Sequence, residues 1–222
     1  MPRRLHHFVP RFYLQRFIDP RAERALVWTY ERGKQEPAMR SIDHIAARNN
    51  YYTVDLGDGR KYEGIERMFA AVESAAAPIF ERLTAGEYQL SSEDREVFSM
   101  FLSLGWSRVP RFRTEIEESA TFLLNKYNED LARDPDKFAA TVAKFESKSG
   151  SHLGDWEEMR QAILEKRFKV VASPELSLKM MALNFEFLAQ MIAAMRWSFR
   201  EADAISPLVT SDSPVVLNNP ST

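Results

Sequence analysis

The sequence predicts a mainly α-helical protein of the α+β class, with long kinked helices and a small β element. From Tyr62 to about Arg200, apolar residues recur at helical spacing. Strand-forming residues gather instead near the two ends of the chain. We therefore expect one domain, 1–222, with an irregular, β-rich head over 1–60, a helical body over 61–200 and a C-terminal loop and strand over 201–222.

Residues 1–20 are expected to be irregular or to contain one short helix. Pro10 can occupy the first turn of a helix, where its missing N–H has no helical partner. Residues 11–17 would then form about two turns. Asp19 and Pro20 end this segment.

Three strands are expected in the rest of the head. Residues 25–30 (ALVWTY) have strand composition, the turn at 31–34 follows them, and a second short strand comes after this turn. Residues 49–54 (NNYYTV) are a further candidate, which the turn at 57–59 closes.

Helix signals are clearest in the body. The first helix runs from Tyr62 to Gly86, and the second begins at a serine cap, Ser91 or Ser92, with acidic residues in its first turn. Pro110 must kink or break this second helix near Arg108. The remaining helices are expected at about 112–131, 135–147, 154–168 and 173–200, the last with Ser173 as its cap and Pro174 at its first position.

The C-terminal residues 205–217 read as loop and strand. A strand at 215–217 needs a partner, so either it pairs with the N-terminal strands or the natural protein continues. Pairing would bring the two ends of the chain together. It would place His6 and His7 near Asp212.

The amino-acid composition and the net charge are those of an ordinary soluble globular protein. Hydrophobic residues make up 45% of the chain and charged residues 28%, and the formal net charge is −2. Any nucleic-acid contact must therefore come from a local patch. The absence of cysteine excludes disulfides, thiolate catalysis and cysteine-ligated metal sites.

The sequence also predicts a cytoplasmic protein that does not span a membrane. The N-terminus carries positive charge, but no apolar run of signal-peptide length follows it. The most apolar stretch, 180–195, contains Asn184, Glu186 and Gln190, and it is too short and too polar for a membrane span.

The most informative polar feature is the segment 3–17. It contains two of the four histidines side by side, His6 and His7, among four arginines and four aromatic residues. Imidazole titrates near neutral pH and binds metals when neutral, so one histidine could act as a ligand or base. The alternative is structural, with His7 packed beside Phe8 and Pro10 and its nitrogens hydrogen-bonded within the fold.

Two glutamates stand seven positions apart on the first body helix. Glu66 and Glu73 therefore project from one side of it, two turns apart, among apolar neighbours. Partly buried carboxylates need partners, and Arg108 on the next helix is a natural one. Either the three form a buried clasp, or the carboxylates join His6, His7 and Asp212 in an acid–base or metal site. Such ligands suit a divalent cation such as Mg²⁺ or Mn²⁺.

Other residues suit substrate binding. Arg108, Arg111 and Arg113, with the arginines of the segment 3–17, could contact a phosphodiester backbone, and Tyr13 could add a stacking surface. The candidate substrate-binding residues are Arg11, Tyr13, Asn50, Arg111 and Ser211.

Several motifs, taken in order, carry a family resemblance. The start, from His6 to Phe17, has the form His-His-x-x-Pro-x-x-Tyr-Leu-x-x-Phe. The motifs that follow are Asn50-Tyr51-Tyr52, the glutamates Glu66 and Glu73, Arg108-Val109-Pro110, and Thr210-Ser211-Asp212-Ser213-Pro214-Val215. The ordered set resembles the bacterial family known as domain of unknown function 4238. The resemblance covers nearly the whole chain and implies no particular activity.

That family also implies an expectation about the C-terminus. Its members usually run on well past the Ser-Asp step, whereas this sequence ends ten residues after Asp212. Either the sequence is truncated or this member is naturally short.

Two functions are open at this point. The first is a hydrolase, with or without a bound divalent cation, that acts on a phosphodiester or nucleic acid through His6, His7, Glu66, Glu73, Arg108 and Asp212. The second is a non-catalytic binding module in which the same residues form a clasp and the basic, aromatic head contacts nucleic acid or a protein. The sequence gives no oligomeric state.

Overall fold

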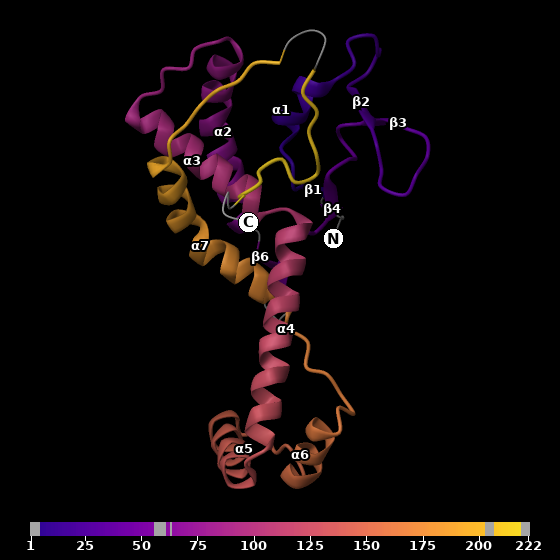
Figure 1. Ribbon diagram of the computed structural model, residues 1–222, viewed down its shortest axis with the longest axis vertical. Helices are drawn as coiled ribbons and strands as arrows, with labels where there is room; N and C mark the ends of the chain where they lie inside the picture. Colours follow the sequence, from indigo (N-terminus) through magenta and orange to yellow (C-terminus); the bar gives the residue numbers. More distant parts are fainter. Residues whose placement is uncertain (1–4, 56–60, 63, 203–206, 219–222) are drawn as a thin grey trace. The chain divides into compact units, whose positions relative to one another are not determined.

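The computed structural model describes residues 5–55, 61–62, 64–202 and 207–218. Within them lie seven α-helices, one 3₁₀ helix and six short strands, so the predicted mainly helical α+β class is confirmed. Two compact units emerge (Figure 1). Unit 1 comprises residues 1–113 and 178–222, and unit 2 comprises residues 114–177. That the chain folds as one domain stays a prediction.

The head of unit 1 starts with a strand that the sequence did not indicate. Strand β1 (Leu5–His7) pairs antiparallel with β4 (Ala47–Asn49), so that His6 lies opposite Arg48. The chain then enters α1 (Arg11–Leu14) and the 3₁₀ turn η1 (Gln15–Phe17), as the Pro10 signal predicts. Val9 and Leu14 are buried and fix this segment to the core.

A second hairpin joins β2 (Leu26–Thr29) to β3 (Ala38–Ser41), in agreement with the predicted pair of strands. Asp19 fastens β2 to the preceding loop. Its carboxylate accepts hydrogen bonds from the Arg21 guanidinium and from Trp28 Nε1, which lies 3.0 Å away. These hydrogen bonds hold the pKa of Asp19 well below its usual value.

The strand predicted over 49–54 is wrong. Strand β4 ends at Asn49, and Asn50 adopts a left-handed conformation with φ of 52°. Asparagine tolerates this region, so the chain turns at Asn50 instead of extending. A separate two-residue strand, β5 (Val54–Asp55), then pairs with β6 (Lys61–Tyr62).

Helices α2 (Gly64–Thr84) and α3 (Ser92–Ser107) pack together around a hydrophobic core cluster of unit 1. Ser91 begins α3 with a reciprocal capping box to Asp94, as the serine signal predicts. Pro110 breaks the helix, because α3 ends at Ser107 and α4 (Pro110–Ala132) begins at the proline itself. The buried side chains between α2 and α3 are Ala76, Ile79, Leu83, Phe98 and Phe101.

Helix α7 (Pro174–Ala194) ends about six residues before the predicted boundary near Arg200. Arg95 of α3 supplies the reason. Its Nε donates to the Ala193 carbonyl at 2.6 Å, and its guanidinium lies 4.5 Å from the Trp197 ring. A cation at the last carbonyls of a helix stabilises an end there.

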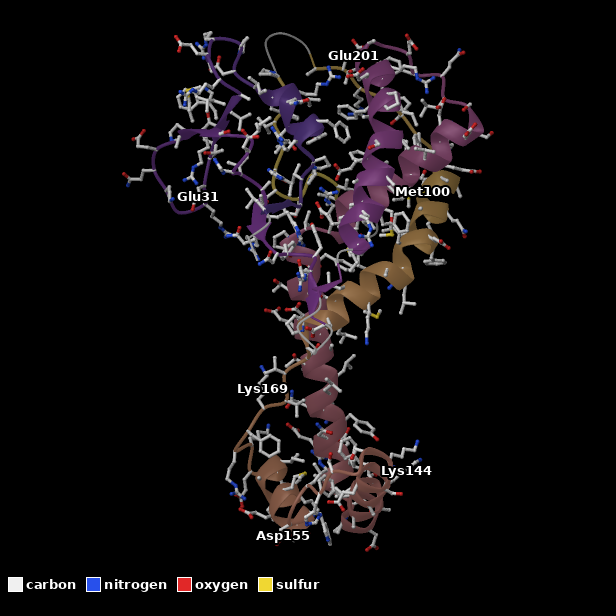
Figure 2. The ribbon with its side chains drawn as sticks, turned by 180° about the vertical axis from the view of Figure 1, so that it is seen from behind. Glu31, Met100, Lys144, Asp155, Lys169 and Glu201 are labelled. Carbon is white, nitrogen blue, oxygen red and sulfur yellow. The ribbon has the colours of Figure 1, made fainter. Side chains whose placement is uncertain are left out.

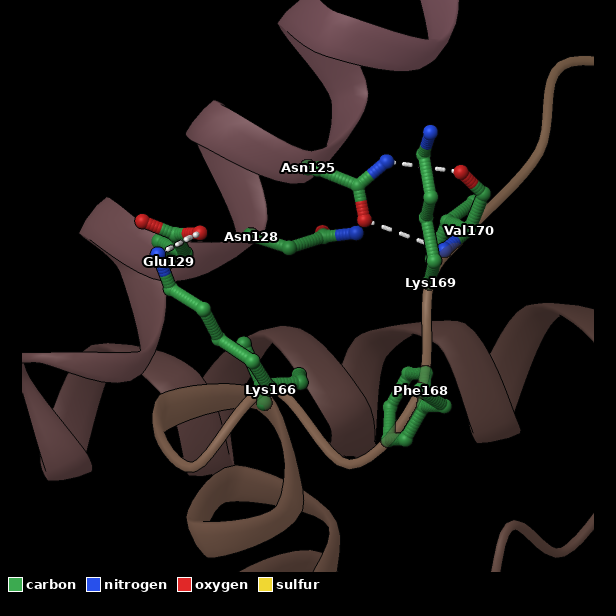
Figure 3. Close-up of a pocket in the computed structure, with 8 residues that line it drawn as sticks. Asn125, Asn128, Glu129, Lys166, Phe168, Lys169 and Val170 are labelled. Atoms are coloured by element: carbon green, nitrogen blue, oxygen red, sulfur yellow. Dashed lines mark hydrogen bonds and ion pairs between the residues drawn. The ribbon is translucent and has the colours of Figure 1, made fainter.

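Unit 2 contains the second part of α4, with α5 (Pro135–Ser149) and α6 (Trp156–Leu164). Its core is formed by Leu131, Ala132, Phe138 and Val142. Asn125 of α4 clamps the extended segment that follows α6. Its side-chain amide donates to the Val170 carbonyl at 2.6 Å and accepts from the Val170 N–H at 3.0 Å (Figure 3).

The last described segment, 207–218, is not a strand. Therefore the predicted strand at 215–217, and its pairing with the N-terminal strands, are wrong. The segment packs instead through side chains. Tyr13 Oη lies 2.8 Å from Thr210 Oγ1, and Val215 packs against Gly105 of α3. Tyr13 and Thr210 thus bring the head and the segment 207–218 together, without a shared sheet in the described part of the chain.

No helix in the described part of the chain is long and apolar enough to cross a membrane. A cytoplasmic location stays a prediction.

Candidate functional site

Arg108 is the centre of the predicted polar set, and it is almost fully buried. Its side chain, 2% exposed, follows the last turn of α3. All three of its nitrogens donate: Nε to the Phe8 carbonyl at 2.9 Å, Nη2 to the His7 carbonyl at 2.8 Å and Nη1 to Glu73 Oε1 at 2.5 Å. The predicted pairing of Glu73 with Arg108 is therefore confirmed. We call these residues the Arg108 clasp: His7, Phe8, Glu73 and Arg108.

The clasp joins three parts of the fold. Phe8 and His7 belong to the head, Glu73 lies on α2, and Arg108 ends α3. The guanidinium also lies 5.3 Å from the Phe69 ring. A buried guanidinium is stable only when its hydrogen-bonding capacity is used, and here the head supplies two of the acceptors.

His6 is buried beside the clasp. Its ring is stacked on Tyr52 with centroids 5.7 Å apart, and its Nδ1 accepts a hydrogen bond from the Tyr52 backbone N–H at 3.1 Å. Tyr52 in turn donates its hydroxyl to the Arg108 carbonyl at 3.0 Å. Burial raises the pKa of Tyr52, which keeps the phenol neutral. His6 thus belongs to a buried network that starts at Arg108.

His7 is only half-buried. Its Nε2 lies 3.1 Å from the Ile42 carbonyl, and because a carbonyl only accepts, Nε2 carries the proton. Burial lowers the pKa of His7 below its usual value of 6.5, an effect that the hydrogen bond to Ile42 opposes and the charges of Arg11 and Arg108 reinforce. The imidazole is therefore neutral at pH 7, with its lone pair on Nδ1.

The remaining predicted catalytic residues have different surroundings. Glu66 is half-buried on α2, near enough to Tyr52 for its charge to affect the phenol. Asp212 is exposed in the C-terminal segment. Among the residues described, no three His, Asp or Glu side chains come together in an arrangement that could hold a metal ion.

The predicted substrate-binding residues come from different segments of unit 1. Arg11 is ion-paired with Asp43, and Tyr13 contacts Thr210. Asn50 occupies the turn after β4, Arg111 is exposed at the start of α4, and Ser211 accepts a hydrogen bond from the Ser213 N–H at 3.1 Å.

Unit 1 contains a groove that the sequence did not indicate. It has a volume of about 720 Å³, within the range of small-molecule sites. Its walls come from α1, from the C-terminal part of α2, from α3, from residues 199–202, and from Leu208, Pro214 and Val215. Six aromatic side chains line it: Tyr13, Phe80, Tyr88, Phe98, Phe101 and Phe199. The helical spacing of Phe98 and Phe101 signals a core face, but it cannot show that the face is left partly open.

The charged residues of the groove come from one short segment. Arg200 and Glu201 are the charged members of its lining. Glu201, marked in Figure 2, accepts a hydrogen bond from the Tyr88 hydroxyl. The ring of Tyr88 is stacked on Phe199 with centroids 5.2 Å apart. The groove is therefore apolar over its floor and polar at one rim.

Unit 2 holds a smaller hollow of about 320 Å³ beside the Asn125 clamp (Figure 3). Lys166 pairs with Glu129 across it at 3.6 Å, and Phe168 and Lys169 lie along the extended segment. The Asn125 hydrogen bonds close one side of the hollow.

A family model described as "Protein of unknown function (DUF4238)" matches residues 5–222. The chain belongs to this family. The match spans the DUF4238 motifs from the His6-His7 pair to the Asp212 segment, and thus both the clasp and the groove. No curated protein matches the chain, and no solved structure does.

Proposed function

We propose that this DUF4238 protein is a non-catalytic binding module, in which the His/Glu/Arg set holds the fold together and the groove of unit 1 receives the ligand. The observation that carries the proposal is the Arg108 clasp. All three guanidinium nitrogens are bonded to groups of the protein itself. A substrate phosphate would have to displace buried partners to reach Arg108.

The hydrolase alternative needs His7, Glu66 and Asp212 to act on one substrate. Neutral His7 has the protonation state of a general base, which is the feature that favours this alternative. Glu73, however, is bonded to Arg108, and Asp212 is exposed on a separate segment. The binding proposal does not require these side chains to lie together in one site.

Nucleic acid is not the ligand we propose. Arg11 and Arg16 of the head are ion-paired with Asp43 and Glu81. Phe12 and Tyr13 pack against Phe80 with centroid distances of 5.9 and 5.6 Å. The head is therefore a docked segment, and its aromatic rings pack on the core of the protein and not on nucleic-acid bases.

Paired stability and activity measurements test the proposal. Arg108→Met leaves Glu73 and two carbonyls without their donor, so the free energy of unfolding should fall by about 3–5 kcal/mol. Glu73→Gln keeps the shape and provides a milder variant. Arg32→Met, at an exposed arginine, is the matched control and should change little.

The same proteins are then assayed with single-stranded DNA and with bis(p-nitrophenyl) phosphate, each with Mg²⁺ and with Mn²⁺. The proposal expects no turnover by the wild-type protein. Turnover that is lost in a fully folded His7→Gln or Glu73→Gln protein would contradict it and establish the hydrolase.

A further inference from the structure

We propose that the groove of unit 1 binds the acyl chain of an apolar carboxylate, such as a fatty acid, with Arg200 at its polar rim. This inference rests on the proposed binding function and assigns its ligand class. It starts from the lining, where aromatic and aliphatic side chains from α2 and α3 face the C-terminal segment.

The floor of the groove suits the apolar part of a ligand. Phe80, Phe98 and Phe101 belong to the packed core of unit 1, so this surface is fixed by its neighbours and needs no large rearrangement. Leu208, 68% exposed, and Val215 form the opposite wall. A buried alkyl chain would cover apolar surface that water now contacts.

The charged residues at the rim of the groove indicate which polar head group the ligand carries. Arg200 and Glu201 have opposite charges, but only the Glu201 carboxylate has a described partner, the Tyr88 hydroxyl. In the part of the chain that the structure describes, Arg200 makes no ion pair. A ligand carboxylate can therefore pair with Arg200, whereas a ligand ammonium would have to compete with Tyr88 for Glu201.

Binding is measured by isothermal titration with laurate below its micelle concentration. Dodecanol and dodecyltrimethylammonium have the same chain length and serve as neutral and cationic probes. We expect laurate to bind at one site, more tightly than either comparator. Lengthening the chain from decanoate to laurate should tighten binding by up to about fourfold per methylene.

Two variants locate the site, each with a neighbouring control. Leu208→Gln should weaken every probe, whereas Val209→Gln, at a residue 88% exposed that does not line the groove, should not. Arg200→Gln should weaken laurate about threefold and leave dodecanol unchanged, because an exposed ion pair contributes modestly. Arg196→Gln is its control. All four positions are exposed, so the variants should fold.

Equal binding of laurate and the two comparators would overturn the carboxylate assignment. Equal effects of Leu208→Gln and Val209→Gln would overturn the location. Neither result would touch the non-catalytic role of the His/Glu/Arg set, since that part of the proposed function stands or falls on the hydrolysis assays.

Discussion

The hydroxyl of Tyr13 lies 2.8 Å from Thr210 Oγ1 and so joins the head of the chain to its C-terminal segment. The two residues are 197 positions apart. Tyr13 also packs on Phe80, so one side chain contacts the core and the segment that covers it.

Removal of this hydrogen bond should loosen the C-terminal segment. Tyr13→Phe and Thr210→Val should each lower the free energy of unfolding by about 1 kcal/mol, because each leaves a hydroxyl without its partner. The double variant should lose less free energy of unfolding than the two single variants lose together. Urea denaturation measures this difference, which is the coupling free energy of the two hydroxyls. Tyr30→Phe, at a side chain 80% exposed, is the control. Fully additive losses would show that the two hydroxyls do not interact.

Acid should weaken the protein partly through His7. Burial lowers the pKa of His7 in the folded state, so below about pH 6.5 the unfolded chain binds the proton more readily. The contribution of His7 to stability is thus complete above that pH and is lost as the pH falls. Between pH 7.5 and 5.5, His7→Gln should lose less stability than the wild type. The exposed His44→Gln should lose as much as the wild type, and the same loss in all three proteins would refute the assignment.

Gly105 should tolerate alanine only when Val215 is shortened. A Cβ at Gly105 would lie 2.9 Å from Val215 Cγ2 but 3.8 Å from Val215 Cβ. Alanine favours a helix interior over glycine by about 1 kcal/mol. Gly105→Ala should therefore stabilise the Val215→Ala protein by about that amount, and the wild type less or not at all. Thermal unfolding of the four proteins makes the comparison, and an equal effect in both backgrounds would argue that Val215 does not pack there.

Two serines one turn apart on α3 should respond in opposite ways to alanine. Ser99 is fully buried, and its hydroxyl has no partner among the described residues. Ser103 Oγ donates to the Phe185 carbonyl of α7 at 2.9 Å. Ser99→Ala should therefore stabilise the protein by about 1 kcal/mol, and Ser103→Ala should destabilise it by about the same amount. Chemical denaturation distinguishes these signs, and destabilisation by Ser99→Ala would reveal a hydrogen bond at that hydroxyl.

The helices could be predicted from the sequence because their signals are local. Ser91 and Pro110 mark a helix start and a break through groups within a few residues of them. The end of α7 could not be predicted, since it depends on Arg95, which lies about 100 positions away in the sequence. Strand β1 was missed for the same reason, because the residues of its partner β4 lie 40 to 44 positions away in the sequence.

The candidate site was likewise predictable from the sequence only in part. The pairing of Glu73 with Arg108 follows from a buried carboxylate and a nearby arginine, and the sequence predicted it. The two backbone acceptors at His7 and Phe8 carry no side-chain signal, so the docking of the head on Arg108 could not be predicted. The groove depends on where the C-terminal segment lies, and the expected strand pairing placed that segment on the wrong partner.

The wall that Leu208, Pro214 and Val215 add to the groove also sets an order of events during synthesis. Chains fold as they leave the ribosome, from the N-terminus onward. All residues of unit 2 have been made once Ser177 is joined, whereas the groove lacks one wall until Val215 follows. A nascent chain therefore has no complete groove until Val215 has been joined.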